Sequence, residues 1–259
     1  VDPNTACVTV DALAAARTPN TRAVIVVHLY GLPVAVPSTA DPAWRDVVVI
    51  EDAAQASGAL GRPKSTAVAY SFYPTKNLGG IGDGGAVVTD DASIAERVRR
   101  LRAHGMTEQY VHESISQNHR MSELEAAWLH LTLPALADDV AARRRIAATY
   151  RDAAPHLRWQ QTHPQHAYHL CVFRSSRRDA TRRQLAAADV ATSVHYPLAL
   201  PQQPAYRSVF ATPCAEAESW AGECVTVPCF AEMTAAEIDQ VARALAELPA
   251  DADRDGAPS

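Results

Sequence analysis

Two short segments of the sequence combine an acid, an amide, a hydroxyl and a lysine in a fixed order. Glu51-Asp52-Ala-Ala-Gln55 directly follows a β-branched run, and Ser71-Phe-Tyr-Pro-Thr-Lys76 follows the next one. The carboxyl ends of parallel strands are where α/β proteins place their ligands. Asp52 and Lys76, at neighbouring strand ends, could therefore face one pocket.

A lysine and an acid in these positions supply the side chains that pyridoxal-5′-phosphate (PLP) chemistry requires. The Lys76 amine could form a Schiff base with the cofactor's aldehyde, and the Asp52 carboxylate could keep the pyridine nitrogen protonated, so that the ring acts as an electron sink. The Ser71 hydroxyl would suit the phosphate, and Gln55 could hydrogen-bond the phenolic oxygen. Taken singly, each residue is as well explained by a solvated turn or a helix cap. From the residues alone, an α/β enzyme of other chemistry therefore remains the broader interpretation.

The glycine-rich run after the lysine raises a rival hypothesis. Gly80-Ile-Gly82-Asp-Gly84-Gly85 formally fits the G-x-G-x-x-G fingerprint of dinucleotide-binding proteins. That fingerprint needs a helix N-terminus to receive the pyrophosphate, whereas these glycines lead into a β-branched run that indicates a strand. A tight hairpin turn beside Lys76 is the favoured interpretation. The sequence also lacks H-E-x-x-H, paired cysteine ligands and G-x-S-x-G, the motifs of zinc enzymes and serine hydrolases.

The strands and helices that must position these residues follow one another in an α/β order. Continuous β-branched runs predict strands that are buried on both faces of a parallel sheet. Strands are predicted over 23–28, 46–50, 67–73 and 86–89, the first two joined by a brief helix that prolines interrupt. Helices are predicted over 93–104, between the Asp90-Asp91 cap and Gly105, and from the Ser122–Glu125 capping box to about 153, with a break at Pro134.

The composition changes after Pro155, which indicates a second domain. Here we predict strands over 168–173 and 191–196, a helix over 180–188 and a last amphipathic helix that begins with the Thr234–Glu237 capping box. The predicted fold class is therefore α/β, with a large domain over 1–138 built on a mostly parallel sheet, a smaller α+β domain over 139–250 and a flexible tail over 251–259.

The overall composition excludes several classes of partner. A formal net charge of -5 offers no basic footprint for a nucleic acid backbone. Five scattered cysteines without a C-x-x-C pair indicate reduced thiols. No apolar run approaches the roughly 18 residues that a membrane helix needs, and the first residues show no signal-peptide pattern. We therefore expect a cytoplasmic protein that binds neither nucleic acid nor membrane.

Four motifs occur in an order that resembles a known family: VIEDAAQASGA, YSFYPTKNLGGIGDGGAVVTDD, LRAHG and QNHRMSELEAAWL. Together they resemble the DegT/StrS family of PLP-dependent nucleotide-sugar aminotransferases, and the resemblance runs from Val1 to about Leu248. It implies the aspartate aminotransferase-type fold (fold type I) and a homodimer with shared active sites. It also implies glutamate or glutamine as the amino donor, and a nucleotide-linked keto sugar or a keto cyclitol as the acceptor.

The motif match implies roles for the cofactor residues. In such proteins the position of Lys76 is the Schiff-base lysine, that of Asp52 the pyridinium partner, that of Gln55 a ring contact and that of Ser71 a phosphate ligand. Asn118, in the N-x-R element, would lie on a loop that reaches the neighbouring subunit's cofactor phosphate.

The resemblance extends to the substrate side. It implies substrate contacts for Arg120 of the same N-x-R element and for His195-Tyr196, which resembles the small-domain segment that lines the sugar in enzymes that aminate carbon 3. The second histidine usual in that segment is absent, so carbon 3 is a preference only. His28 and Tyr30, in the VHLYG turn, resemble a recurring motif near the cofactor.

One departure from the family pattern leaves an alternative open. In relatives, a long part of the large domain precedes the segment that begins here at Val1, including the turn that holds the phosphate and the aromatic side chain that stacks on the pyridine ring. We therefore expect the front of the large domain to be missing, which would leave strand edges unpaired. A noncatalytic or truncated relative, acting as a binding or regulatory protein, is the alternative. Lys76 favours transamination, because the related sugar dehydratases carry a histidine at this position.

Overall fold

The computed structural model describes residues 1–61, 65–209 and 212–251, and these form two compact units. One unit is Val8–Asp138, and the other combines Val1–Cys7 with the chain from Asp139 onward. The tail predicted over 251–259 lies, beyond Asp251, outside the described residues. Among the described residues, no helix is long and apolar enough to cross a membrane.

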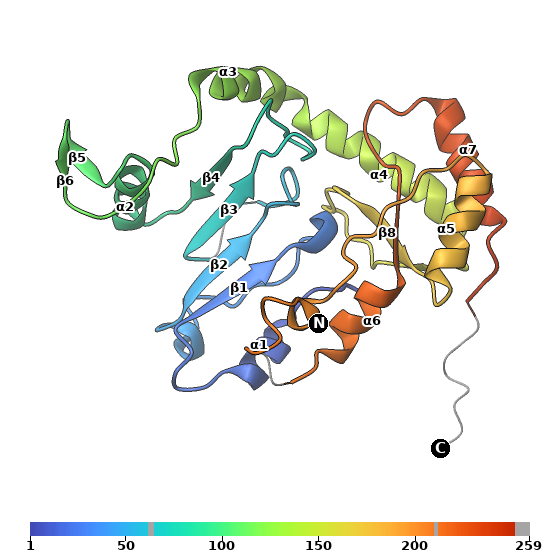
Figure 1. Cartoon of the computed structure of the whole chain (residues 1–259), viewed down its shortest axis with the longest axis horizontal. Helices are drawn as coiled ribbons and strands as arrows, with labels where there is room; N and C mark the ends of the chain where they lie inside the picture. Colours follow the sequence, from blue (N-terminus) through green and yellow to red (C-terminus); the bar gives the residue numbers. More distant parts are fainter. Residues whose placement is uncertain (62–64, 210–211, 252–259) are drawn as a thin grey trace. The chain divides into compact units, whose positions relative to one another are not determined.

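A four-stranded sheet forms the centre of the unit Val8–Asp138 (Figure 1). Its order follows the chain: β1 (Ala23–Val27), β2 (Val48–Asp52), β3 (Ala67–Ser71) and β4 (Gly85–Val88). The first three strands run parallel, whereas β4 pairs antiparallel with β3. The four predicted strands are therefore confirmed, with ends shifted by a few residues. The predicted brief, proline-interrupted crossover is confirmed: among its described residues it holds two short 3-10 turns, η1 (Leu29–Gly31) and η2 (Pro42–Trp44), and no α-helix.

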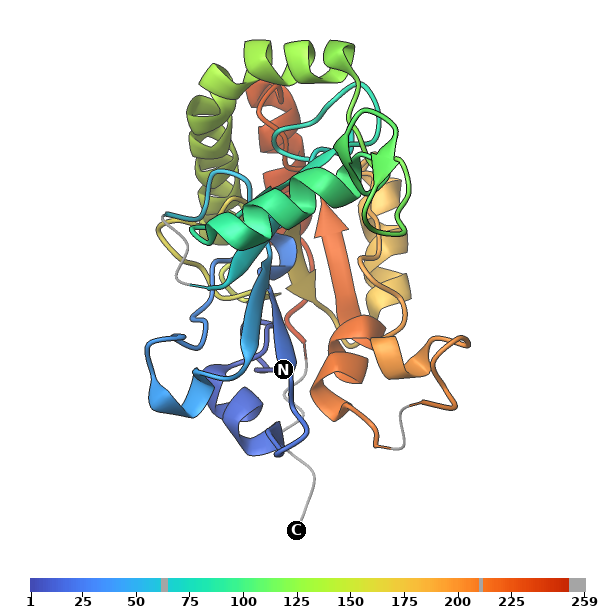
Figure 2. The ribbon, with the colours of Figure 1, turned by 90° about the vertical axis from the view of Figure 1, so that its left-hand side faces the viewer.

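Helices and a small hairpin complete this unit. α1 (Val10–Ala16) is capped by Thr9, and α2 (Ala92–Arg102) by Asp91, as predicted. Gly105 follows α2 with a φ of 73°, which glycine adopts without strain. The chain then forms the short hairpin of β5 (Met106–Glu108) and β6 (Val111–His112), which stands away from the four-stranded sheet in Figure 1 and lies near one end of α2 in Figure 2.

The predicted long helical region is real and is broken where proline predicts. α3 (Glu123–Thr132) leads through the 3-10 turn η3 (Leu133–Ala135) into α4 (Leu136–Ala153). Pro134 sits in the first turn of η3, where its missing N–H and fixed φ are tolerated. The boundary between the two units falls near the start of α4.

The second unit packs helices on a three-stranded antiparallel sheet of β7 (Arg158–Trp159), β8 (Cys171–Arg174) and β9 (Cys224–Val227). Its helices are α4 from Asp139 onward, α5 (Arg178–Ala187), η4 (Leu200–Gln202), α6 (Ala215–Glu223) and α7 (Ala235–Ala246). The Thr234–Glu237 capping box forms in full at the start of α7. Tyr150, Phe173, Leu185, Val225 and Leu245 are fully buried at the centre of this unit.

The strand predicted over 191–196 is wrong. Residues 191–196 form only an isolated bridge, in which Ser193 and Thr226 exchange two backbone hydrogen bonds, because the segment has a pairing partner at this one position and not along its length. Residues 1–7 belong here rather than with residues 8–138. Trp220 Nε1 donates to the Pro3 carbonyl at 3.1 Å, and Gln160 Nε2 donates to the Thr5 carbonyl at 2.7 Å.

Candidate active site

The ends of β2 and β3 bring the predicted acid and hydroxyl to one face of the sheet. Asp52 pairs in register with Ala69, and Ser71 lies two residues further along β3. Side chains two residues apart on a strand point the same way, so Asp52 and Ser71 share a face. The Asp52 carboxylate accepts from the Ala54 N–H at 3.0 Å, which holds the start of the turn that follows β2.

Lys76 follows on the turn that leaves β3. The Ser71 hydroxyl accepts from the Tyr73 N–H at 3.3 Å, and the Lys76 N–H donates to the Tyr73 carbonyl at 2.8 Å. The Lys76 side chain is half-buried. Burial lowers the pKa of its ammonium, and the negative charge of Asp52 raises that pKa in part. The structure therefore brings Lys76 within the electrostatic field of Asp52.

Gln55 is buried and its amide has a fixed direction. Gln55 Oε1 accepts from the Tyr30 N–H at 2.6 Å. A backbone N–H can only donate, so the oxygen must face Tyr30 and the Nε2 donors must lie at the opposite end of the amide. Tyr30 presents its N–H from a backbone with φ of 62°, and Gly31 follows with φ of 99°. The VHLYG turn therefore sets which end of the Gln55 amide faces Tyr30.

His28 connects the same turn to the end of β2. Its Nδ1 accepts from the Val34 N–H at 3.1 Å, so the ring proton lies on Nε2, which donates to Glu51 Oε2 at 2.9 Å. Burial raises the pKa of Glu51, but hydrogen bonds from His28 and Ser65 outweigh burial and leave that pKa lowered. His28 is fully buried and Tyr30 nearly so. Both ring nitrogens of His28 therefore bond to groups of the protein, and the ring has no exposed surface.

Helix α3 contacts the glycine-rich loop. The motifs of the sequence do not predict this contact. The Ser122 hydroxyl caps α3 by accepting from the Glu125 N–H, but Glu125 does not return to the cap. Its carboxylate accepts instead from the Ile81 N–H at 3.1 Å. The predicted capping box is therefore only half formed, because the loop offers Glu125 another donor.

The residues predicted for the partner's cofactor and for the sugar come from other segments of the chain. Asn118 and Arg120 are exposed on the segment between β6 and α3, where Asn118 Oδ1 accepts from the Arg120 N–H and Nε at 3.2 and 3.1 Å. His195 and Tyr196 belong to the second unit. His195 Nδ1 and Thr226 Oγ1 lie 2.9 Å apart, and 48% of the Tyr196 surface is exposed.

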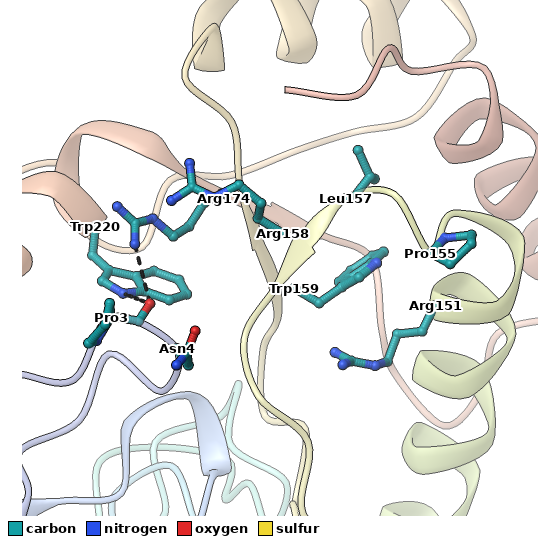
Figure 3. A pocket seen from close by; sticks show the side chains of 9 residues that line it. All are labelled: Pro3, Asn4, Arg151, Pro155, Leu157, Arg158, Trp159, Arg174 and Trp220. Carbon is teal, nitrogen blue, oxygen red and sulfur yellow. Dashed lines mark hydrogen bonds between the residues drawn. The ribbon is translucent and has the colours of Figure 1, made fainter. Parts of the chain in front are cut away.

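The second unit also has a pocket of about 440 Å³ that none of the predicted residues line (Figure 3). Its charged lining is entirely basic, comprising Arg151, Arg158 and Arg174, with Trp159 and Trp220 beside them. Arg174 Nε donates to Glu223 at 2.9 Å, and Arg158 lies 3.2 Å from the same carboxylate. The guanidinium groups of Arg158 and Arg174 are therefore already paired with a carboxylate.

A family comparison identifies the chain. The sequence model of the DegT/DnrJ/EryC1/StrS aminotransferase family matches residues 1–246. The chain belongs to this family. Curated relatives include the erythromycin biosynthesis sensory transduction protein EryC1 of Saccharopolyspora erythraea, 42% identical over 82% of this chain and 62% of that protein. A dTDP-3-amino-3,4,6-trideoxy-alpha-D-glucose transaminase of Streptomyces venezuelae is 40% identical over 80% of this chain and 58% of that protein. The chain thus spans about three fifths of the length of these two relatives.

Solved structures of this DegT family share the fold. DesV of S. venezuelae, in complex with a ketimine intermediate, has a TM-score of 0.84 and 35% identity, covering 95% of this chain and 70% of DesV. NtdA of Bacillus subtilis, solved with bound cofactor PMP, has a TM-score of 0.85 and 25% identity, covering 95% of this chain and 60% of NtdA. The predicted α/β, aspartate aminotransferase-type fold is confirmed.

Proposed function

We propose that this protein is a PLP-dependent aminotransferase that moves an amino group from glutamate or glutamine to a nucleotide-linked keto sugar, with carbon 3 as the favoured position. The observation that carries the proposal is the Lys76 amine, half-buried after β3 and within the field of Asp52. The DegT-family relative in S. venezuelae is named as a transaminase of a 3-amino sugar, which supports the substrate class and the carbon.

The side chains at the strand ends fit the chemistry of PLP. Bound PLP would supply an aldehyde carbon for covalent attachment and a ring that withdraws electrons from the amino donor. Lys76 would hold the aldehyde carbon, and Asp52 would pair with the ring nitrogen. The Nε2 end of Gln55 would donate to the phenolic oxygen, because its Oε1 already accepts from Tyr30. The Ser71 hydroxyl would bind the phosphate.

The Lys76 amine is also suited to proton transfer. A lysine acts as a base only when its amine is unprotonated, and burial favours that form by lowering the pKa. Asp52 opposes this effect in part, so the pKa of Lys76 depends on both its burial and its neighbour. Lys76 would take the proton from the α-carbon of the amino donor and pass it to the carbon that was the cofactor's aldehyde. In the second half of the reaction it would move a proton from that carbon to the sugar carbon that receives the amine.

For the substrate side and the subunit arrangement, we propose a second copy of the chain as partner. Asn118 would contact the partner's cofactor phosphate, and Arg120, His195 and Tyr196 would contact the sugar. Apolar side chains around the same segment are exposed by at least 75% of their surface, as expected of an uncovered interface: Tyr110, Ile115, Leu124 and Leu131. His28 and Tyr30 are too buried to reach a sugar, so we propose that they support the ends of the strands instead.

Reductive trapping tests the attachment site. Lys64 and Lys76 are the two lysines of the sequence, so Lys64→Arg is a matched control for Lys76→Arg. We expect borohydride to fix PLP on wild type and on Lys64→Arg, with the added mass on the peptide that contains Lys76. Lys76→Arg should gain no such mass. A label on Lys64, or no label on wild type, would contradict the proposal and favour a noncatalytic binding protein.

The substrate and the shared site need a second experiment. Incubation with glutamate or glutamine and candidate nucleotide keto sugars, followed by mass spectrometry and NMR, would locate the new amine. An amine on a cyclitol, or on a carbon other than 3, would replace that part of the proposal. Mixing inactive Lys76→Arg with Asn118→Ala should recover activity if each site takes residues from both subunits. No recovery would exclude the shared site.

A further inference from the structure

Helix α3 holds the loop that follows Lys76 at two points. Trp128 Nε1 donates to the Gly79 carbonyl at 3.0 Å, and the Ile81 N–H donates to Glu125 Oε2 at 3.1 Å. Residues three apart on a helix lie on one side of it, so Glu125 and Trp128 face the loop together. One side of α3 therefore binds both an acceptor and a donor of the loop backbone.

Glu125 packs so closely against Gly80 that a side chain at that position would have to displace its carboxylate. A Cβ on Gly80 would lie 1.4 Å from Glu125 Oε1, and a Cβ on Gly84 would lie 3.6 Å from the same oxygen. Glu125 is only 3% exposed. Among the described residues, its Oε1 has no hydrogen-bond partner. A polar atom that is buried without a hydrogen bond is unfavourable, so its presence here asks for an explanation.

The loop itself is closed around Lys76. The Gly80 N–H donates to the Phe72 carbonyl at 2.8 Å, which joins the chain before the lysine to the chain after it. A Cβ on Gly79 would lie 2.3 Å from the Pro74 carbonyl oxygen, so the backbone here has no room for a side chain. Because α3 binds the backbone of Gly79 and Ile81, it also holds in place the C-terminal end of the loop that carries Lys76.

We infer that Glu125 and Trp128 are positioning residues for Lys76, acting through the loop Phe72–Ile81 without contacting cofactor or substrate. The chemical consequence of this role rests on the proposed function, but the existence of the contact does not. The two can be tested separately, because exchange of backbone amides in the cofactor-free protein needs no catalysis.

The first measurement is hydrogen exchange of the peptide that covers the loop, in cofactor-free protein. Glu125→Ala and Trp128→Phe should each raise exchange there by about tenfold, as for one lost hydrogen bond. Glu125→Gln should remain near wild type, since its amide oxygen can still accept from Ile81. Glu123→Ala, on the exposed side of the same helix, is the control and should change nothing in the loop. Unchanged exchange in Glu125→Ala and Trp128→Phe would overturn the inference.

The second measurement separates positioning from mere support. With PLP added, the pH midpoint of the lysine-bound chromophore and the rate of borohydride trapping at Lys76 should shift in Glu125→Ala and Trp128→Phe, but not in Glu125→Gln or Glu123→Ala. Faster loop exchange without either shift would contradict a positioning role. If wild-type Lys76 is never trapped by borohydride, the proposed function is wrong and so is the positioning role. The hydrogen-exchange data would still decide whether α3 holds the loop.

A compensating pair guards against variants that simply fail to fold. Gly80→Ala should lower the melting temperature, because its methyl group would overlap Glu125 Oε1. The double variant Gly80→Ala/Glu125→Ala removes that oxygen and should recover part of the loss. No recovery would show that the overlap is not what requires glycine at this position.

Discussion

Two regions of the molecule collect charged side chains, and they differ in how those charges are paired. In the basic pocket of the second unit, Arg174 donates to Glu223 and to Ser219. It also donates to the Pro3 carbonyl and stacks over Trp220 (Figure 3). At the ends of β2 and β3, the ammonium of Lys76 has no ion pair among the described residues and lies only within the field of Asp52. The pocket with more charge is therefore the one whose arginines have partners, and the single charge at the strand ends is the one to which we assign chemistry in the proposed function.

Among these variants, Lys76→Arg should give the largest loss of activity. A small loss would contradict the assignment of chemistry to the strand ends. Activity should fall by roughly a thousandfold or more, because an arginine keeps the positive charge but cannot form the covalent link. The free energy of unfolding should change little. Steady-state kinetics and urea denaturation of the same samples check both statements, with Lys64→Arg measured alongside.

Glu223→Gln should show the opposite profile. It leaves the buried guanidinium of Arg174 without its carboxylate, which should cost about 3 kcal/mol of unfolding free energy or more. Glu216 lies 3.9 Å from the same arginine but is half-exposed, so Glu216→Gln should change stability by about 0.5 kcal/mol at most. Urea denaturation compares the two. Equal losses would mean that Arg174 is not paired as the structure describes.

Asp52→Asn should sharpen the assignment of the strand ends. PLP should still attach at Lys76, whereas both halves of the reaction should slow by about a hundredfold once the ring nitrogen loses its partner. Because Asp52 raises the pKa of Lys76, the variant should also move the pH midpoint of the lysine-bound chromophore downward. An unchanged rate, or a midpoint that moves upward, would remove Asp52 from this role.

His166 predicts how the stability of the second unit depends on pH. Burial, aided by Arg151 and Arg144, lowers the pKa of His166 from 6.5 to about 3. The folded pKa is the lower one, so its contribution to stability is complete above pH 6.5 and is lost as pH falls toward 3. At about pH 5 the loss should be about 2 kcal/mol relative to neutral pH. Urea denaturation of wild type and His166→Asn checks this, since the variant should lose less.

The sequence predicts what is local in this fold. β-branched runs predict the strands of the first unit, Asp91 and Thr234 predict helix starts, and Pro134 predicts a break, because each effect acts within a few residues. The strand ends then follow from the order of strands, which is why the sequence predicts that Asp52 and Lys76 face one pocket.

Contacts between distant segments could not be predicted in this way. Glu125 reaches Ile81 across 44 residues and Trp128 reaches Gly79 across 49, and no local pattern distinguishes either from a capping residue or an exposed aromatic. The strand predicted over 191–196 failed because a β-branched run says nothing about whether a neighbour is available along its whole length. Such contacts depend on the packing of finished elements, which spacing alone does not specify.

The turn at Tyr30 restricts which amino acids can serve at a position 25 residues away. Its amide proton demands an acceptor from residue 55, while a phenolic oxygen in the site would demand a donor from the same side chain. Glutamate satisfies only the first demand and lysine only the second, although both resemble glutamine in length. The backbone at Tyr30 thus restricts which side chains can replace Gln55. Only a side chain that both accepts and donates hydrogen bonds would meet the two demands.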